Sequence, residues 1–216
     1  PVEGHSRDAV YGIPWFGLSP ENGYPLVQNT NGYDQDYAGY LNRLTLDDLK
    51  MKGVSVPPFY GSLRNMFSYK GVTLDVMLGW KSGYVFKRSS SNGIVYSMNY
   101  HMDYLKRWQK PGDELLTNVP AVRNIDNVTP SSGTIYDSSE ILIEKGDHIR
   151  LQDISLSYTL PKNAAMRNTI RNVRLYAYAR NLGVIWKSNK HGIDPDYVNS
   201  ESVAPRTFAL GLQIDF

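Results

Sequence analysis

The stretch that decides the fold is the last one, Phe208-Ala-Leu-Gly-Leu-Gln-Ile-Asp-Phe216. Successive side chains of a β-strand point to opposite faces. One face of this strand would be small or polar, and the other would carry Phe208, Leu210, Leu212, Ile214 and Phe216. Such a strand suits the wall of an outer-membrane β-barrel, where one face meets lipid and the other meets a wet lumen. The alternative is the last strand of a soluble sheet whose apolar face packs on a core.

Further stretches upstream show the same alternation, namely residues 59–69, 72–80, 149–160 and 173–181. Gly71 lies between the first two, and its freedom to adopt a positive φ predicts a tight hairpin. The apolar phase of residues 149–160 changes near Asp153, which predicts a β-bulge or a strand that rises above the membrane. Residues 10–18 are a weaker candidate because Pro14 cannot donate to a strand ladder.

The connections between these strands alternate between short and long. The short ones span residues 70–71 and 161–171, whereas the long ones span residues 19–58, 87–147 and 182–204. Compact soluble domains usually keep their loops to about 4–6 residues. Outer-membrane barrels instead combine short periplasmic turns with long extracellular loops. The pattern therefore predicts an all-β fold: a segment of about five or six antiparallel strands of a transmembrane barrel. The carboxy terminus would be periplasmic and the long loops extracellular.

Composition excludes several classes of function. The 216 residues contain no cysteine, so neither a disulfide framework nor a thiol nucleophile is available. The net charge of +2 and the lack of a basic run argue against a nucleic-acid partner. No apolar stretch approaches the roughly 20 residues of a membrane helix. Sixteen of the residues are tyrosines, whose amphipathic rings suit membrane interfaces and sugar-facing surfaces.

Candidate chemical groups are few. Asp194 and Asp196 could be paired catalytic carboxylates or calcium ligands, but an Asp-Pro-Asp loop more often caps its own backbone. The four histidines have no partners at metal-ligand spacing. We therefore predict no catalytic residue, no metal site and no cofactor, and hence no enzyme.

Aromatic residues are the most suggestive binding feature. Tyr100, Tyr104 and Trp108 are four residues apart in a predicted short helix over residues 98–108, within an extracellular loop. Their rings could stack on sugars or fill peptide pockets, or they could pack the helix onto its neighbours. Trp80 and Trp186 are expected near the membrane–water boundary, although Trp186 could also pack within its loop.

Several motifs, taken in order, resemble one family. Residues 146–161 contain Ile-Arg-Leu followed by Ser-Leu-Ser-Tyr-Thr-Leu-Pro, and residues 173–182 form a strand ending in Asn-Leu. Residues 194–196 are Asp-Pro-Asp, and the stretch 205–216 matches a closing strand. Together they resemble the carboxy-terminal part of SusC/RagA-type TonB-dependent outer-membrane transporters. The resemblance covers nearly the whole chain, residues 1–216, as one piece of a larger protein.

The resemblance implies a 22-stranded barrel closed by a separate amino-terminal plug. It also implies energised import of a large nutrient, an oligosaccharide or a peptide, with no nucleic acid involved. The implied partners are a SusD-like surface lipoprotein, TonB acting through the plug, the rest of the barrel and outer-membrane lipid. Residues 208–216 resemble the signal strand that the barrel-assembly machinery recognises. The rival hypothesis is a soluble β-rich domain that binds or hydrolyses carbohydrate, whose 72–80 apolar face would pack on a second sheet.

Overall fold

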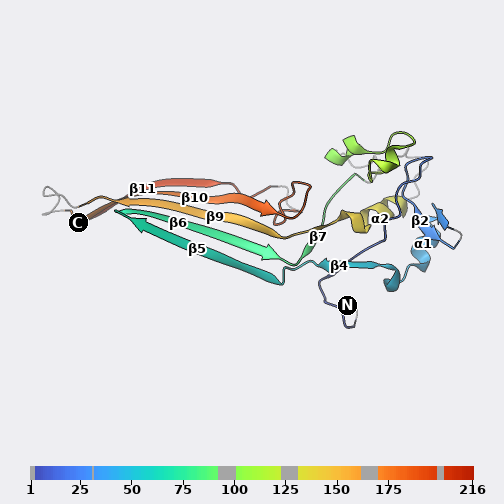
Figure 1. Cartoon of the computed structure of the whole chain (residues 1–216), viewed down its shortest axis with the longest axis horizontal. Coiled ribbons are helices and arrows are strands. Elements are labelled where there is room, and N and C mark those ends of the chain that lie inside the picture. The colour runs from blue at the N-terminus through green and yellow to red at the C-terminus, as the bar shows by residue number, and fades with distance from the viewer. Residues whose placement is uncertain (1–2, 31, 92–100, 123–130, 162–169, 199–201) are drawn as a thin grey trace. The chain divides into compact units, whose positions relative to one another are not determined.

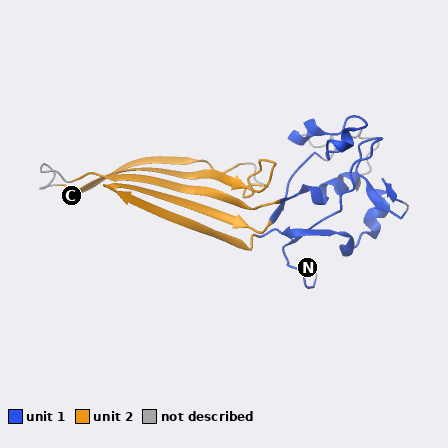
Figure 2. Ribbon diagram, in the orientation of Figure 1, with its two compact units in different colours: residues 1–56, 85–144 blue, residues 57–84, 145–216 orange. Residues whose placement is uncertain are grey.

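The computed structural model describes residues 3–30, 32–91, 101–122, 131–161, 170–198 and 202–216 (Figure 1). The chain divides into two compact units, shown in different colours in Figure 2. Unit 1 consists of Pro1–Val56 and Val85–Glu144, and unit 2 consists of Pro57–Tyr84 and Lys145–Phe216. Each unit is described separately below. No helix among the described residues is both long and apolar enough to cross a bilayer.

Unit 2 is a single five-stranded antiparallel sheet, with the strands side by side in the order β11-β10-β9-β6-β5 (Figure 1). Its strands are β5 (Phe59–Tyr69), β6 (Val72–Ser82), β9 (His148–Thr159), β10 (Asn172–Lys187) and β11 (Thr207–Asp215). The expected antiparallel β-fold is confirmed, and all five alternating stretches form these strands. The described part of the unit contains no helix.

The hairpin between β5 and β6 forms where the sequence predicts it. Lys70 and Gly71 occupy the turn with φ values of 47° and 84°, and Tyr69 pairs directly with Val72. Two consecutive positive φ values are the signature of a type I′ turn, whose twist matches that of the flanking strands. This turn fixes the register of the whole β5–β6 ladder.

The change of phase in β9 is a β-bulge. Met77 and Leu78 on β6 lie opposite Asp153 and Leu151 on β9, so Gln152 is an extra residue in this ladder. An extra residue moves the following side chains to the other face of the strand. The apolar residues at the amino-terminal end of β9 therefore lie on the same face as the apolar residues of β6.

The apolar face of the sheet is open. Leu74, Leu156, Leu175 and Leu212, one from each of four strands, are exposed by 36%, 47%, 48% and 56%. Within the described part of unit 2, no second layer packs on these side chains. The soluble alternative, which places residues 72–80 against a second sheet, is not supported by this arrangement.

Unit 1 is built from short elements around small cores. Its elements are β1 (Ala9–Gly12), β2 (Val27–Asn29), β3 (Gly32–Asp34), α1 (Tyr37–Arg43), η1 (Leu46–Asp48), β4 (Lys50–Val54), β7 (Val85–Lys87), η2 (Met102–Lys106), η3 (Asp113–Leu115), α2 (Ser131–Asp137), η5 (Glu140–Leu142) and β8 (Ile143–Lys145). The strands pair as β1–β4, β2–β3 and β7–β8. One core contains Val27, Tyr37 and Ile135, and a second contains Leu18 and Trp108.

Three expectations differ from this structure. Residues 10–18 do not form a strand of the main sheet, because β1 ends at Gly12, before Pro14, and pairs with β4. The described parts of the two longest connections, residues 19–58 and 87–147, contain short strands and helices of unit 1, beyond the single short helix expected there. The third connection is shorter than expected, since β10 continues through Lys187.

Candidate functional site

The apolar face of the sheet ends in a row that contains tryptophan. Trp80 on β6 and Trp186 on β10 both pair with Ile149 on β9, so the three side chains form one row. The two tryptophans are 42% and 52% exposed. Trp80 lies over Gly61 on β5, where a Cβ atom would come within 2.9–3.0 Å of the indole ring. Any larger residue there would displace the ring.

Tyrosines occupy the opposite end of the same face. Tyr69 on β5 and Tyr158 on β9 both pair with Val72, and they are 73% and 40% exposed. Val72 and Trp80 are eight residues apart on β6, which corresponds to about 26 Å along the strand. Strands of outer-membrane barrels tilt, and their apolar band is about 25 Å tall between two aromatic girdles. At a tilt of about 40°, about 26 Å along a strand spans about 20 Å across the membrane, so both rows lie within the height of this band.

The other face of the sheet is polar and internally paired. The Arg64 guanidinium donates to both carboxylate oxygens of Asp75, at 2.7–3.0 Å. Tyr178 donates its hydroxyl proton to Asp153, and Arg180 contacts the same carboxylate at 3.3 Å. Charged pairs of this kind suit a wet lumen better than a dry core.

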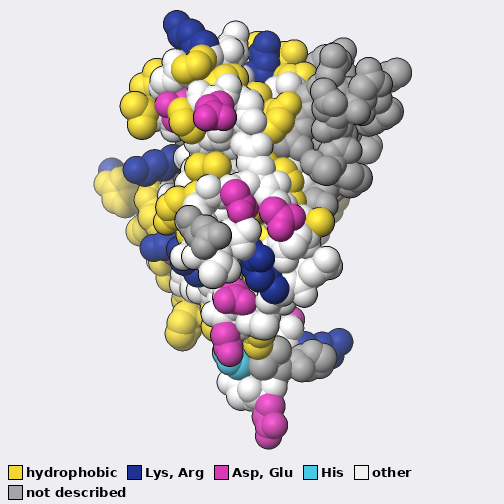
Figure 3. Space-filling model, turned by 90° about the vertical axis from the view of Figure 1, so that its right-hand side faces the viewer, with side chains coloured by type: hydrophobic (Ala, Val, Ile, Leu, Met, Phe, Trp, Pro, Cys, Tyr) yellow, Lys and Arg dark blue, Asp and Glu magenta, His cyan; other side chains and the backbone are white. Residues whose placement is uncertain are grey.

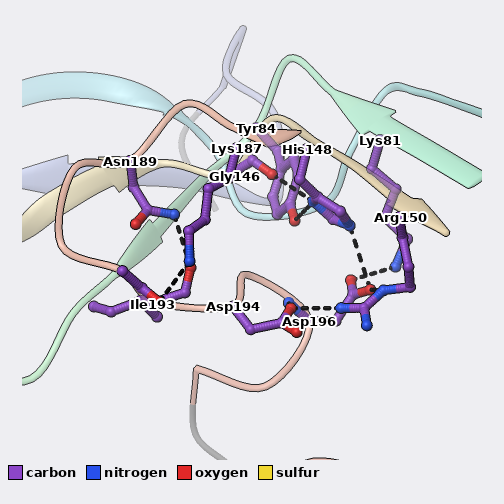
Figure 4. A network of polar contacts seen from close by, with 11 residues as sticks. Lys81, Tyr84, Gly146, His148, Arg150, Lys187, Asn189, Ile193, Asp194 and Asp196 are labelled. Atoms are coloured by element: carbon purple, nitrogen blue, oxygen red, sulfur yellow. Dashed lines mark hydrogen bonds and ion pairs between the residues drawn. The ribbon is translucent and has the colours of Figure 1, made fainter. Parts of the chain in front are cut away.

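A polar network fastens the loop between β10 and β11 to two neighbouring strands (Figure 4). Asp196 accepts from Lys81 on β6 at 2.7 Å and from Arg150 on β9 at 3.1 Å. The His148 ring on β9 approaches the same carboxylate, with Nε2 3.3 Å from Oδ2. Asp194 accepts from the second arm of Arg150 at 2.5 Å. Three basic side chains thus converge on two carboxylates of one loop.

Electrostatic interactions keep the Asp196 carboxylate of this network ionised. The hydrogen bond from His148 is the main cause that lowers the pKa of Asp196 well below its usual range. Burial works against this shift, and the ion pair with Lys81 adds to it. Burial also raises the pKa of Tyr84, with contributions from the nearby aspartates, so its hydroxyl stays protonated. That hydroxyl lies 3.3 Å from Nδ1 of His148.

The loop also binds itself. The Asp196 backbone N–H donates to the Asp194 carboxylate at 3.1 Å, which is the self-capping turn expected of an Asp-Pro-Asp sequence. The Lys187 ammonium donates to the carbonyl of Gly192 at 2.5 Å, and the Asn189 amide donates to the carbonyl of Ile193 at 3.0 Å. The two carboxylates therefore hold cationic side chains and backbone in place. Among the described residues, no group of three or more potential ligands is arranged to hold a metal ion.

Sequence reasoning found the Asp-Pro-Asp loop but not its basic partners. Lys81, His148 and Arg150 lie far from the loop in sequence, and only the β6–β9 register brings them together. The sequence offers one signal: Lys81 directly follows the predicted strand 72–80 and His148 directly precedes the predicted strand 149–160. Unpaired positive charge at a strand end, opposite an acidic loop, indicates such a contact.

The predicted aromatic site is only partly visible. Tyr100 lies outside the described residues. Tyr104 stacks under the Arg107 guanidinium, 4.1 Å from ring centroid to Cζ. The Trp108 ring is buried in the second core of unit 1, and its indole N–H donates to Glu114 at 3.1 Å. Trp108 therefore packs within this core. Of the short helix predicted over residues 98–108, Met102–Lys106 forms a 3-10 helix, and residues 98–100 lie outside the described residues.

The predicted signal strand is β11, which pairs with β10 along its length. Its apolar side chains are exposed by 72%, 88%, 56% and 39% for Phe208, Leu210, Leu212 and Ile214. Phe216 follows the strand and is 74% exposed.

On the face drawn in Figure 3, hydrophobic side chains and charged side chains of both signs are interspersed, without a region of one sign.

Comparison with known proteins places this geometry in context. The chain is 24% identical over 244 residues to TonB-dependent receptor P3 of Formosa agariphila, covering 99% of this chain and 22% of that protein. It is 23% identical over 210 residues to TonB-dependent receptor P26 of the same organism, covering 88% of this chain and 20% of that protein. The chain thus spans about a fifth of the length of these curated relatives. No family model matches it.

Solved structures show the same fold. A structure of the RagAB peptide transporter aligns with 96% of this chain and 22% of its own, at a TM-score of 0.66 and 21% identity. The RagAB peptide importer in the "open-open" state aligns with 95% of this chain and 22% of its own, at a TM-score of 0.64 and 22% identity. The likeness of this chain to SusC/RagA-type TonB-dependent transporters, indicated by its motifs, is therefore confirmed over nearly its whole length.

Proposed function

We propose that this chain forms part of the wall of a β-barrel in a bacterial outer membrane, within an importer energised through TonB. The observation that carries the proposal is the single-layer sheet of unit 2. Its open apolar face is bounded by the Trp80 row and the Tyr158 row, and its other face carries paired charges. A soluble protein would have to cover that apolar face, whereas lipid covers it in a barrel wall.

The importer would carry a large nutrient, an oligosaccharide or a peptide. Its partners would be a SusD-like surface lipoprotein, the remainder of the barrel and its plug, TonB and the barrel-assembly machinery. The names of the similar proteins, TonB-dependent receptors and a peptide importer, support this assignment. In this proposal the chain does no covalent chemistry: the residues assigned here form wall, rim and assembly signal.

The sheet would be oriented with the β5–β6 hairpin in the periplasm and the β10–β11 loop outside. The lengths of the connections support this arrangement, because the β5–β6 turn is short and outer-membrane barrels have short turns on the periplasmic side and long loops outside. The carboxy terminus would be periplasmic and the long connections extracellular.

Fractionation and labelling of the complete protein test the proposal. We expect the protein to sediment with outer membranes, to need detergent for extraction and to support TonB-dependent uptake of labelled oligosaccharide or peptide. Recovery in the supernatant of a high-speed spin would contradict it.

Two single-cysteine variants form a matched pair of probes for the orientation of the sheet, because this chain contains no cysteine of its own. Lys70→Cys lies in the hairpin turn and Lys190→Cys in the β10–β11 loop, and both lysines are exposed. In intact cells, an impermeant maleimide should label Lys190→Cys and spare Lys70→Cys until the outer membrane is opened. The reverse pattern would overturn the orientation.

A further inference from the structure

The loop between β10 and β11 lies over the polar face of the sheet. Lys81 and His148 are cross-strand partners, and each precedes or follows a residue of the tryptophan row, Trp80 or Ile149. Because consecutive strand residues point to opposite faces, Lys81 and His148 point away from the apolar face. Arg150 shares their side, since it follows Ile149. A loop whose carboxylates contact these three side chains must fold over the polar face.

The contacts that hold the loop are largely shielded from water. The side chains of His148, Arg150, Asp194 and Asp196 are 2%, 13%, 21% and 22% exposed, whereas that of Lys81 is 43% exposed. Exposed ion pairs contribute little, whereas removing one partner of a buried, hydrogen-bonded charge leaves the other unpaired at a substantial cost. Asp196 alone contacts three basic side chains from two strands. The loop cannot leave the sheet without breaking these contacts together.

The loop is also preorganised by its own bonds. Its backbone carbonyls at Gly192 and Ile193 accept from Lys187 and Asn189, and its Asp194 carboxylate caps the Asp196 N–H. These bonds fix the position of the two carboxylates relative to the end of β10. The loop is therefore held at its tip, at its start and by internal hydrogen bonds, and these contacts together make it rigid.

We propose that residues 188–198 form a fixed rim on the passage side of the barrel, latched by Asp194 and Asp196, and that this rim does not leave the sheet during import. The inference rests on the proposed function, because the polar face lines a passage only if the sheet belongs to a barrel. The latch itself can be measured without transport.

A covalent lock tests whether the rim moves. In the complete transporter, Lys81→Cys and Asp196→Cys would be joined by a short bis-methanethiosulfonate linker that a reductant cleaves. We expect the linked protein to take up labelled cargo within twofold of the wild-type rate. A tenfold or greater loss that reductant restores would overturn the inference. The two single variants, treated with the same reagent, control for modification alone.

Proteolysis tests the latch independently of uptake. Lys190 is exposed and offers a tryptic site within the loop. We expect cleavage there, in outer-membrane vesicles, to rise at least tenfold in the Asp194→Asn/Asp196→Asn variant. The control is Asp215→Asn, at the opposite end of β11, and trypsin should cleave this variant at the wild-type rate. Equal cleavage of the double variant and wild type would overturn the latch.

The two measurements distinguish a failure of the proposed function from a failure of the fixed-rim inference. If wild-type protein shows no TonB-dependent uptake, the proposed function fails, and proteolysis alone still decides whether the network holds the loop. If wild-type uptake is normal and the linked variant is blocked, only the fixed-rim inference fails.

Discussion

Trp80 on β6 and Trp186 on β10 lie in one row of the sheet, on either side of Ile149. The row depends on two irregularities: the bulge at Gln152 brings Ile149 back to the apolar face, and the register shift between Val184 and Trp186 on β10 places Trp186 opposite Ile149. Local backbone irregularity thus aligns aromatic residues from distant parts of the chain. In a barrel wall, this row would sit at the lipid–water boundary.

The first prediction concerns depth on the apolar face. Ile154 pairs with Val76, midway between the tyrosine and tryptophan rows. We expect Ile154→Arg to lower the free energy of unfolding by about 2–4 kcal/mol, and Tyr158→Arg by at most about 1 kcal/mol, because the cost of a buried cation falls toward the interface. Ser155→Arg, on the polar face, is the matched control and should change stability little. Denaturant unfolding in lipid vesicles measures all three, and equal effects for Ile154→Arg and Ser155→Arg would contradict a lipid-facing sheet.

A second prediction concerns assembly. Removing Phe216, which is exposed and follows β11, should reduce the yield of folded protein in the outer membrane several-fold. Phe216→Tyr keeps an aromatic ring and should assemble normally. Heat-modifiable mobility of membrane fractions on gels reports the yield, and undiminished insertion of the deletion variant would remove Phe216 from the signal.

The β10–β11 loop should respond to acid. The fold lowers the pKa of Asp196, so the folded chain binds this proton more weakly than the unfolded chain. The stabilisation is therefore complete above the ordinary aspartate pKa of about 4 and is lost as the pH falls below it. We expect amide exchange in residues 188–198, corrected for intrinsic rates, to accelerate below about pH 4. Asp196→Asn should exchange faster at neutral pH and lose most of this step. An unchanged step in the variant would assign it to another group.

Unit 1 offers a buried ion pair for the fourth prediction. Arg88 donates to Asp103 at 2.8 Å, and both residues are buried. Arg88→Met leaves this carboxylate without its main cation and should destabilise unit 1 by about 3–5 kcal/mol. Lys106→Met removes an exposed ammonium 3.8 Å from the same carboxylate and should cost at most about 1 kcal/mol. Hydrogen exchange in residues 101–106 distinguishes the two variants, and equal protection would show that Arg88 does not hold this segment.

The sheet could be predicted from sequence because its signals are local. The β5–β6 register follows from a two-residue turn, and strict alternation sets the face of each side chain. The break of phase in β9 predicted its bulge. The continuation of β10 was missed, because Asn181 and Gly183 adopt positive φ at an irregular stretch of the ladder and interrupt the alternation. The predicted connection over residues 182–204 therefore includes Trp186, which the structure places on β10.

The rest depends on contacts between distant residues. The strands of unit 1 are three to five residues long, too short for a periodic signal. The network around Asp196 requires the β6–β9 register and the path of a loop that returns over the sheet. Neither is encoded by spacing along the chain. The burial of Trp108 likewise follows from its partners in a core, not from its helical spacing with Tyr104.

The extra residue at Gln152 has a practical consequence for comparing such proteins. Any method that infers membrane topology from strict two-residue alternation will split β9 in two and miscount the crossings, reversing the inferred sidedness of everything beyond it. An alignment that permits a one-residue gap at Gln152 will keep both halves of β9 in phase. In relatives that lack this extra residue, the apolar residues before the position should alternate on the opposite parity.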